Sequence, residues 1–218
     1  MWPPGGAFVV DDSEIAKPGD CKVESWASFA SNTDFLGVTS PACVANLGWP
    51  VELGFSLARF RSDDEWGSEL VLKGKTNILP AGIGKIGLGF SGAVAFDLLT
   101  GEHSASSVNV PATFEIVEQF KINVNAGWLY TRPEDLNWFT YGAGFEWNFI
   151  KPLTLIGEVF GLAGQSVEPF SRTDLRAQLG LRYMPYESVD IDVISGRNIL
   201  GENANWITVG LNFRFDTK

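Results

Sequence analysis

A strict two-residue alternation of side-chain character recurs along nearly the whole chain and constrains its fold more than any other feature. Residues 206–215 read WITVGLNFRF, and from Ile207 to Phe215 every second residue is apolar while those between are polar or small. Successive side chains of a β-strand point to opposite faces, so this segment predicts a strand with one apolar and one polar face. The apolar face of such a strand lies either in a soluble core or against lipid.

Similar segments predict twelve strands, each about as long as a tilted strand needs to cross a bilayer. They span residues 21–31, 35–43, 51–61, 67–79, 85–97, 106–117, 120–131, 137–149, 152–162, 174–184, 188–196 and 205–215. Tight turns at 117–120, 150–152 and 185–188 alternate with longer connections such as 98–106 and 197–204. We therefore predict an all-β fold, a closed antiparallel transmembrane β-barrel with short periplasmic turns and longer extracellular loops.

The two faces of these strands decide between lipid and a soluble core. A soluble, lipocalin-like barrel would place the apolar face inside, and alternation by itself allows that arrangement. Three observations favour lipid. Aromatic residues gather toward strand ends, as at Trp128 and Trp147, in the manner of interfacial girdles. The polar face is rich in Gly and Ser, which suit a narrow lumen, and the apolar side chains are too many for the inside of a small barrel.

Composition and charge exclude other classes of protein. The chain has 218 residues, enough for one domain, and its 45% hydrophobic content argues against disorder. A net charge of -10 argues against a nucleic-acid partner. No run approaches the roughly 18 to 20 apolar residues of a membrane-spanning helix.

The start, MWPPGGAFVV, lacks the features of a secretory leader. Either the protein stays in the cytoplasm or a leader was removed and Met1 was added for expression, and the barrel pattern favours the second.

We expect two parts in the chain, an N-terminal periplasmic arm or plug at residues 1–20 and the transmembrane barrel at 21–218. The arm is rich in Pro, Gly and Asp. Three placements are open for it: it hangs in the periplasm, it folds into the bore as a plug, or it binds a partner. Trp2-Pro3-Pro4 cannot extend a strand ladder, because proline lacks the amide donor.

Two stretches resemble bacterial outer-membrane proteins. The last strand, which finishes on Phe215, resembles the C-terminal insertion signal of outer-membrane barrels, although three residues follow it here. The opening AFVVDDSEIAKPGDCKVES, with Asp11, Asp12, Gly19 and Glu24, resembles the start of the outer-membrane transporters of the meta pathway of phenol degradation. This resemblance implies passage of small solutes, aromatic or apolar ones among them, across the outer membrane.

The two cysteines predict a disulfide. Cys21 and Cys43 are equidistant from residue 32, so they are cross-strand neighbours if the first hairpin turns there. An oxidising periplasm permits the bond, and two free thiols are the alternative. Two Cys and one His are an incomplete set of ligands, so we expect no metal site and no cofactor.

Charged residues on the polar face form the candidate site, because that face points into the lumen. Isolated charges there are costly, whereas paired charges are tolerated. A turn centred on Tyr186 predicts Arg182 opposite Asp190, with Asp192 one step along, and barrel closure predicts Arg214 beside Glu24. The charges either brace the wall as ion pairs or form a constriction that selects solutes. The full predicted set is Glu24, Glu52, Glu69, Lys73, Lys75, Lys121, Glu146, Arg176, Arg182, Asp190, Asp192 and Arg214.

Other motifs predict no chemistry. His103, the only histidine, lies in GEHSASS with no obvious carboxylate beyond Glu102, so we expect a solvated loop and not a catalytic group. The run GIGKIGLGFSG belongs to a predicted strand, with no following helix to bind phosphate. Acidic residues in the outer loops, such as Asp63 and Glu134, predict a solvated rim, with cation bridging to lipopolysaccharide as the alternative.

These observations lead us to expect a non-enzymatic barrel in the outer membrane, surrounded by lipid and lipopolysaccharide, that acts as a channel or transporter for small solutes. The alternative is a sealed barrel with a structural or partner-binding role in an envelope assembly. The width of the bore and the position of the arm distinguish the two.

Overall fold

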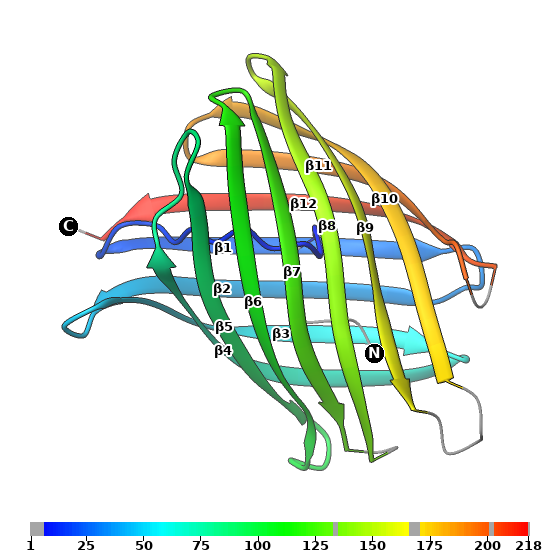
Figure 1. Cartoon of the computed structure of the whole chain (residues 1–218). Coiled ribbons are helices and arrows are strands. Elements are labelled where there is room, and N and C mark those ends of the chain that lie inside the picture. The colour runs from blue at the N-terminus through cyan, green and yellow to red at the C-terminus, as the bar shows by residue number, and fades with distance from the viewer. Residues whose placement is uncertain (1–6, 133–134, 166–170, 201–202, 218) are drawn as a thin grey trace.

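Twelve antiparallel strands close into one barrel, which confirms the predicted fold class (Figure 1). The computed structural model describes residues 7–132, 135–165, 171–200 and 203–217. Each strand pairs with its neighbours in the sequence, and β1 closes the barrel against β12. The strands are β1 Asp20–Ala30, β2 Phe35–Asn46, β3 Pro50–Ser62, β4 Glu65–Leu79, β5 Ile86–Asp97, β6 His103–Val117, β7 Phe120–Thr131, β8 Leu136–Ile150, β9 Leu153–Gln165, β10 Ser171–Tyr186, β11 Val189–Asn198 and β12 Asn205–Asp216.

The predicted strand bounds agree with these to within three residues at every strand end. At one end of the barrel, which we call the turn end, tight connections such as 118–119, 151–152 and 187–188 join the strands. At the other, the loop end, the connections range from two residues at 63–64 to six at 199–204, and the turn-end connection at 80–85 also has six residues, so the two ends differ in connection length by only a few residues. Met1, Trp2-Pro3-Pro4 and Glu134, which carried predictions, lie outside the described residues.

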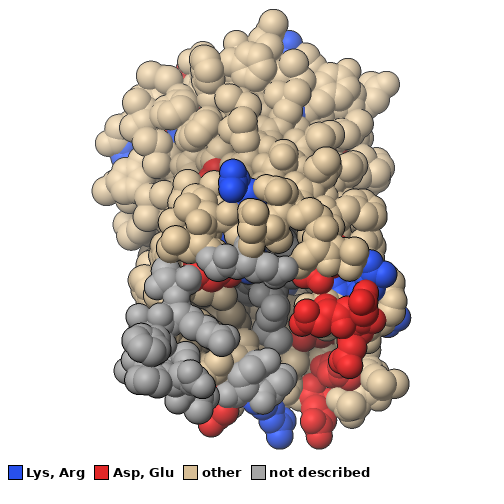
Figure 2. Space-filling view, turned by 90° about the vertical axis from the view of Figure 1, so that its right-hand side faces the viewer, with Lys and Arg blue, Asp and Glu red and all other residues tan. Residues whose placement is uncertain are grey.

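Large apolar side chains cover the outer wall, as predicted for lipid contact. In the middle of β11 and β12, the cross-strand neighbours Val193 and Val209 are 53% and 48% exposed. Tan residues cover most of the space-filling view, while acidic residues gather in its lower part (Figure 2). In water such a surface would cost about 25 cal/mol for each Å² of apolar area, whereas hydrocarbon removes that cost. Within the described residues, no helix has the length and apolar character needed to cross a membrane.

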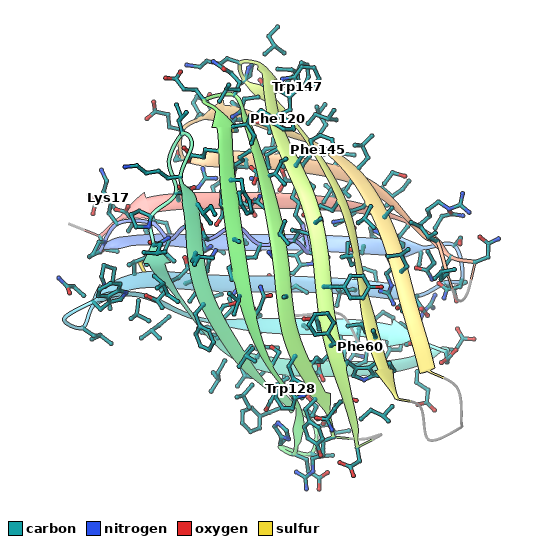
Figure 3. All side chains as sticks on the ribbon, viewed as in Figure 1. Lys17, Phe60, Phe120, Trp128, Phe145 and Trp147 are labelled. Carbon is teal, nitrogen blue, oxygen red and sulfur yellow. A yellow bond between two sulfur atoms is a disulfide. The ribbon has the colours of Figure 1, made fainter. Side chains whose placement is uncertain are left out.

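Aromatic side chains gather at both ends of the barrel. Phe120, Phe145 and Trp147 lie near the turn end, and Trp128 lies near the loop end (Figure 3). The rings of Phe120 and Phe145 stack at 6.0 Å, and those of Trp128 and Tyr130 stack at 6.2 Å. Such belts match the headgroup layers on the two sides of a bilayer, where amphipathic rings are favoured.

The inner wall differs from the prediction in its loop-end half, where large apolar side chains lie among the polar and small ones. Two clusters of inward side chains line it, and both contain a fully or nearly buried large residue, Trp26 in one and Leu129 in the other. The first cluster is Trp26, Leu36, Val38, Ala58 and Phe60, and the second is Val71, Ala95, Ala105, Leu129, Trp138 and Leu162. The sequence patterns miss these residues because alternation shows on which face of the strand a residue lies. It does not show whether the inner face is polar or apolar at a given depth in the barrel.

The predicted disulfide is present. Cys21 and Cys43 lie directly opposite each other in the β1–β2 pair, and their Cα atoms are 4.0 Å apart. The bond therefore joins the first two strands at the turn end, next to the residue where the arm enters β1.

The apolar outer wall generates a stability prediction. Val193→Arg, in the middle of β11, is expected to lower the free energy of unfolding in lipid vesicles by about 2–4 kcal/mol, because it places a charge in hydrocarbon. Leu47→Arg, in the turn between β2 and β3, is the matched control and is expected to cost about 0–1 kcal/mol. Urea unfolding followed by tryptophan fluorescence measures both. Equal costs for the two variants would contradict the lipid-facing assignment of the wall.

Candidate functional site in the bore

The described part of the N-terminal arm, residues 7–19, lies inside the barrel (Figure 1). It reaches β1 at the turn end, where Gly19 has a φ of 99°. This left-handed conformation favours glycine. The Gly19 N–H donates to the carbonyl of Val44, and the Gly19 carbonyl accepts from the N–H of Thr217. Val44 on β2 and Thr217, which directly follows β12, therefore fix the position of Gly19, where the arm turns into the bore.

One buried carboxylate binds the arm's main chain. Glu158 on β9 is 5% exposed, and it accepts hydrogen bonds from the N–H groups of Val9 at 3.0 Å and Val10 at 3.1 Å. The amide of Gln178 donates to the same carboxylate at 2.6 Å. Sequence analysis missed Glu158, although it is the one charged residue in LTLIGEVFGLAG and lies on the inward face of its strand.

Three polar side chains of the wall continue this array along the arm. Asn125 accepts from the Asp11 N–H at 2.9 Å and donates to the Asp11 carbonyl at 2.7 Å. Thr113 accepts from the Ser13 N–H at 2.9 Å, and Asn77 donates to the Ser13 carbonyl at 2.6 Å. The wall thus satisfies the main-chain polar groups that the arm buries, as a neighbouring strand would.

Glycines on the inward face make room for the arm. An added Cβ would lie 2.8 Å from the Val10 side chain at Gly142, 2.8 Å from the Phe8 ring at Gly180 and 2.4 Å from the Ser13 hydroxyl at Gly87. All three distances are shorter than van der Waals contact. Val10 also packs against buried Phe160 and Trp206. The Gly-rich inner face therefore fits a bore that holds a polypeptide segment.

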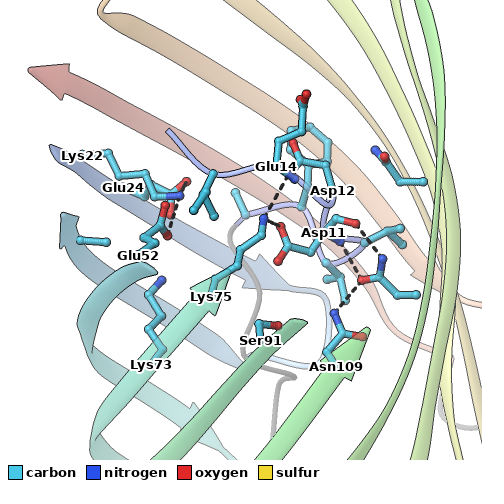
Figure 4. A pocket seen from close by; sticks show the side chains of 18 of the residues that line it. Asp11, Asp12, Glu14, Lys22, Glu24, Glu52, Lys73, Lys75, Ser91 and Asn109 are labelled. Carbon is cyan, nitrogen blue, oxygen red and sulfur yellow. Dashed lines mark hydrogen bonds and ion pairs between the residues drawn. The ribbon is translucent and has the colours of Figure 1, made fainter. Parts of the chain in front are cut away.

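Ion pairs join the arm to two lysines of the wall, of which Figure 4 shows Lys75. Lys75 Nζ lies 2.8 Å from Asp11 Oδ1 and 3.1 Å from Asp12 Oδ1. Lys121 Nζ lies 3.6 Å from Asp12 Oδ2 and 3.8 Å from Glu14. Burial disfavours the charged form of Asp12, but Lys75 and Lys121 outweigh burial and lower the pKa of Asp12. Burial also raises the pKa of Asp11, which shares Lys75 with Asp12.

The predicted lumen charges lie on inward strand faces, and most of them pair within the wall. Lys22, which the predicted set omitted, lies 3.2 Å from Glu52 and 3.7 Å from Glu24. Lys121 lies 3.3 Å from Glu146. The Arg176 guanidinium pairs with Asp174 two residues earlier on the same strand.

Two predicted pairings are wrong. Arg182 faces Asp192 and not Asp190, because the β10–β11 hairpin turns at residues 187–188 and not at Tyr186. Its Nε atom is 2.8 Å from Asp192 Oδ1 and 3.8 Å from Asp190 Oδ2.

Arg214 was predicted to lie beside Glu24, but the β1–β12 register places it opposite Lys22. Both Nη atoms of Arg214 bind the carboxylate of Asp190 on β11. Asp190 and Asp192 are fully buried, so the ion pairs with these two arginines compensate for the loss of water around both carboxylates.

Lys73 and Glu69 share the inward face of β4 with Lys75. Lys73 lines the cavity described below, and among the described residues no carboxylate lies within ion-pair distance of it. Glu69 lies closer to the loop end, directly opposite Asp97 on β5, and is not among the residues that line the cavity.

A cavity of about 680 Å³ remains beside the arm. The arm forms part of its lining, from Ala7 to Ala16. On the wall, the lining extends from Asp174 and Arg176 on the loop-end side to Ser188 and Asp216 at the turn end. The bore is therefore occupied by the arm without being filled by it.

His103 lies on β6 and not in a loop. It forms a hydrogen bond of 2.8 Å with Ser106, and its ring stacks on Tyr130 at a centroid distance of 6.1 Å. Within the described residues, no hydrogen bond or ion pair joins it to a carboxylate. His103 is therefore part of an aromatic cluster at the loop end.

The close fit at Gly142 generates a prediction about the arm. Gly142→Val is expected to displace the arm, because the new side chain would overlap Val10, and to raise hydrogen exchange of the amides at residues 9–13 about tenfold or more. Hydrogen exchange read by mass spectrometry in detergent checks this. Gly74→Val is the control, since an added Cβ there meets only Leu53 and the β3 backbone, at 3.6 Å or more. Unchanged exchange of residues 9–13 in Gly142→Val would contradict the docked position.

Comparison with known proteins agrees with this fold. The COG4313 outer membrane channel from Pseudomonas putida F1 has a TM-score of 0.69 at 12% identity, over 94% of this chain and 98% of that one. The NanC porin has a TM-score of 0.68 at 8% identity, over 88% and 98%. The KdgM porin has a TM-score of 0.66 at 11% identity, over 89% and 99%. These likenesses show the fold of outer-membrane porins and channels, in agreement with the predicted location.

Sequence comparison assigns the family. No curated protein matches the chain. The family model described as Uncharacterised conserved protein UCP029691 matches residues 2–215, which is nearly the whole chain, and the chain therefore belongs to that family.

Proposed function

We propose that this barrel conducts small solutes across the outer membrane through a bore that its own N-terminal arm narrows. The cavity of about 680 Å³ beside the arm carries this proposal, because a barrel sealed by its own arm and side chains has no need of such a space in its bore. Ionised side chains line that space, as they line selective pores. The porins and the channel that share this fold also support a role as a channel.

Two further features bear on the class of solute. The KdgM porin has been described in complex with disordered oligogalacturonate, a small-molecule ligand of that protein. The resemblance of residues 7–25 to transporters of the phenol-degradation pathway stays a prediction, and it favours small aromatic or apolar solutes.

A sealed barrel with a structural or partner-binding role is the second candidate. The arm supports it, since Val9 and Val10 pack against Phe160 and Trp206 and their N–H groups bind Glu158. A segment held in this way obstructs the bore for as long as it stays docked.

Conductance separates the two functions. Purified protein in planar bilayers is expected to give discrete current steps, and proteoliposomes are expected to swell faster with arabinose than with a trisaccharide. Gly142→Val is expected to raise the conductance, because it displaces the arm while the closed sheet keeps its register. Gly74→Val serves as the control and is expected to match the unaltered protein. A barrel that gives no current and no swelling, alone or as Gly142→Val, would contradict the channel and support the sealed barrel.

A further inference from the structure

We propose that Lys73, Lys75 and Lys121 form a binding site for the carboxylates of small organic acids, and that Asp11 and Asp12 of the arm occupy this site as an intramolecular substitute. The inference rests on the proposed function and names the class of solute that the bore selects. It begins from the way in which the lysines are paired.

The wall provides carboxylate partners for some of its lysines and not for others. Lys22 pairs with Glu52 and Glu24, and Lys121 pairs with Glu146. Lys75 lies opposite Glu52 in the β3–β4 register, but Glu52 lies 3.2 Å from Lys22 instead. Both carboxylates within ion-pair distance of Lys75 belong to the arm. Lys73 has none among the described residues. Without the arm, β4 would present two ammonium groups to the bore.

The geometry of the site suits two neighbouring carboxylates. Lys73 and Lys75 lie two residues apart on one strand, so their Cα atoms are about 7 Å apart on one face. Asp11 and Asp12 converge on Lys75 at 2.8 and 3.1 Å, and Lys121 reaches the other oxygen of Asp12 from β7 at 3.6 Å. A short dicarboxylate can place its two charged groups as these adjacent aspartates do.

The site is reachable from the cavity. Lys73, Lys75, Asp11 and Asp12 all line it, whereas Lys121 is not among its lining residues. Figure 4 shows Lys75 directed toward the arm's acids and Lys73 extending toward Glu52. The main chain of the arm is held by other groups, Asn125 and Thr113 among them. A solute carboxylate can therefore compete for the lysines without extracting the whole arm.

Removing the arm's charges tests the site directly. In Asp11→Asn/Asp12→Asn the main-chain hydrogen bonds to the wall stay, while the internal competitor is lost. Binding of succinate to the purified barrel in detergent, measured by isothermal titration calorimetry, is expected to be at least about tenfold tighter in this variant, because apparent affinity scales with the fraction of free sites. Succinamide, which is uncharged, is expected not to bind. Asp63→Asn/Asp64→Asn, in the β3–β4 turn, is the matched control and is expected to behave as the unaltered protein.

A second substitution distinguishes succinate binding at the lysine site from binding elsewhere on the protein. Adding Lys75→Gln to the double variant is expected to abolish succinate binding, and adding Lys75→Arg is expected to retain it. In bilayers under a KCl gradient, the double variant is expected to shift the reversal potential toward anion selectivity, and Lys75→Gln to cancel the shift. Heat-modifiable migration on gels confirms that each variant is folded.

The outcomes distinguish this inference from the proposed function. No succinate binding in the double variant, or binding that survives Lys75→Gln, would overturn the lysine site. Because binding in detergent needs no conduction, the absence of current from every variant would contradict the channel alone. Current without succinate binding would contradict the carboxylate site alone.

Discussion

Closure of a twelve-stranded sheet with an apolar outer face is the constraint on which the rest of the structure depends. Once β1 pairs with β12, every second residue of every strand points into a narrow bore. Charges there are partly removed from water, so a partner of opposite sign stabilises them, and most of them have one. Fully buried Asp190 and Asp192 pair with Arg214 and Arg182 from neighbouring strands. The lumen is consequently a network of ion pairs and not an open row of charges.

The arm completes that network in one place. Its contacts are of two kinds, which differ in what they demand of its sequence. Glu158, Asn125 and Thr113 bind main-chain groups, and they would hold many segments of extended chain. Lys75 and Lys121 bind the two aspartates, and they require acids at those positions. The first kind anchors the arm in the bore, and the second makes the arm a competitor for anions that enter it.

Much of this architecture could be predicted from the sequence. Period-two alternation identified the strands and their faces, and the turn of the first hairpin near residue 32 identified the Cys21–Cys43 pair, because each of these follows from local geometry. The partners of Arg182 and Arg214 could not be predicted in the same way. Alternation gives the face of a residue but not the register between strands, and the β10–β11 hairpin turns at residues 187–188 instead of at Tyr186, which moves every pairing along the two strands. The arm lacks periodicity altogether, so its contacts with Glu158 and Lys75 emerged only from the folded chain.

The most direct test of this account places a photocrosslinking residue inside the bore. The Phe8 ring lies 5.3 Å from the Arg182 guanidinium and close to Gly180, both on β10. With p-benzoylphenylalanine in place of Phe8, irradiation of intact outer membranes should give an intramolecular crosslink that mass spectrometry maps to β10 or the adjacent part of β11. Crosslinks to periplasmic proteins, with none to these strands, would show that the arm lies outside the barrel and would contradict the account.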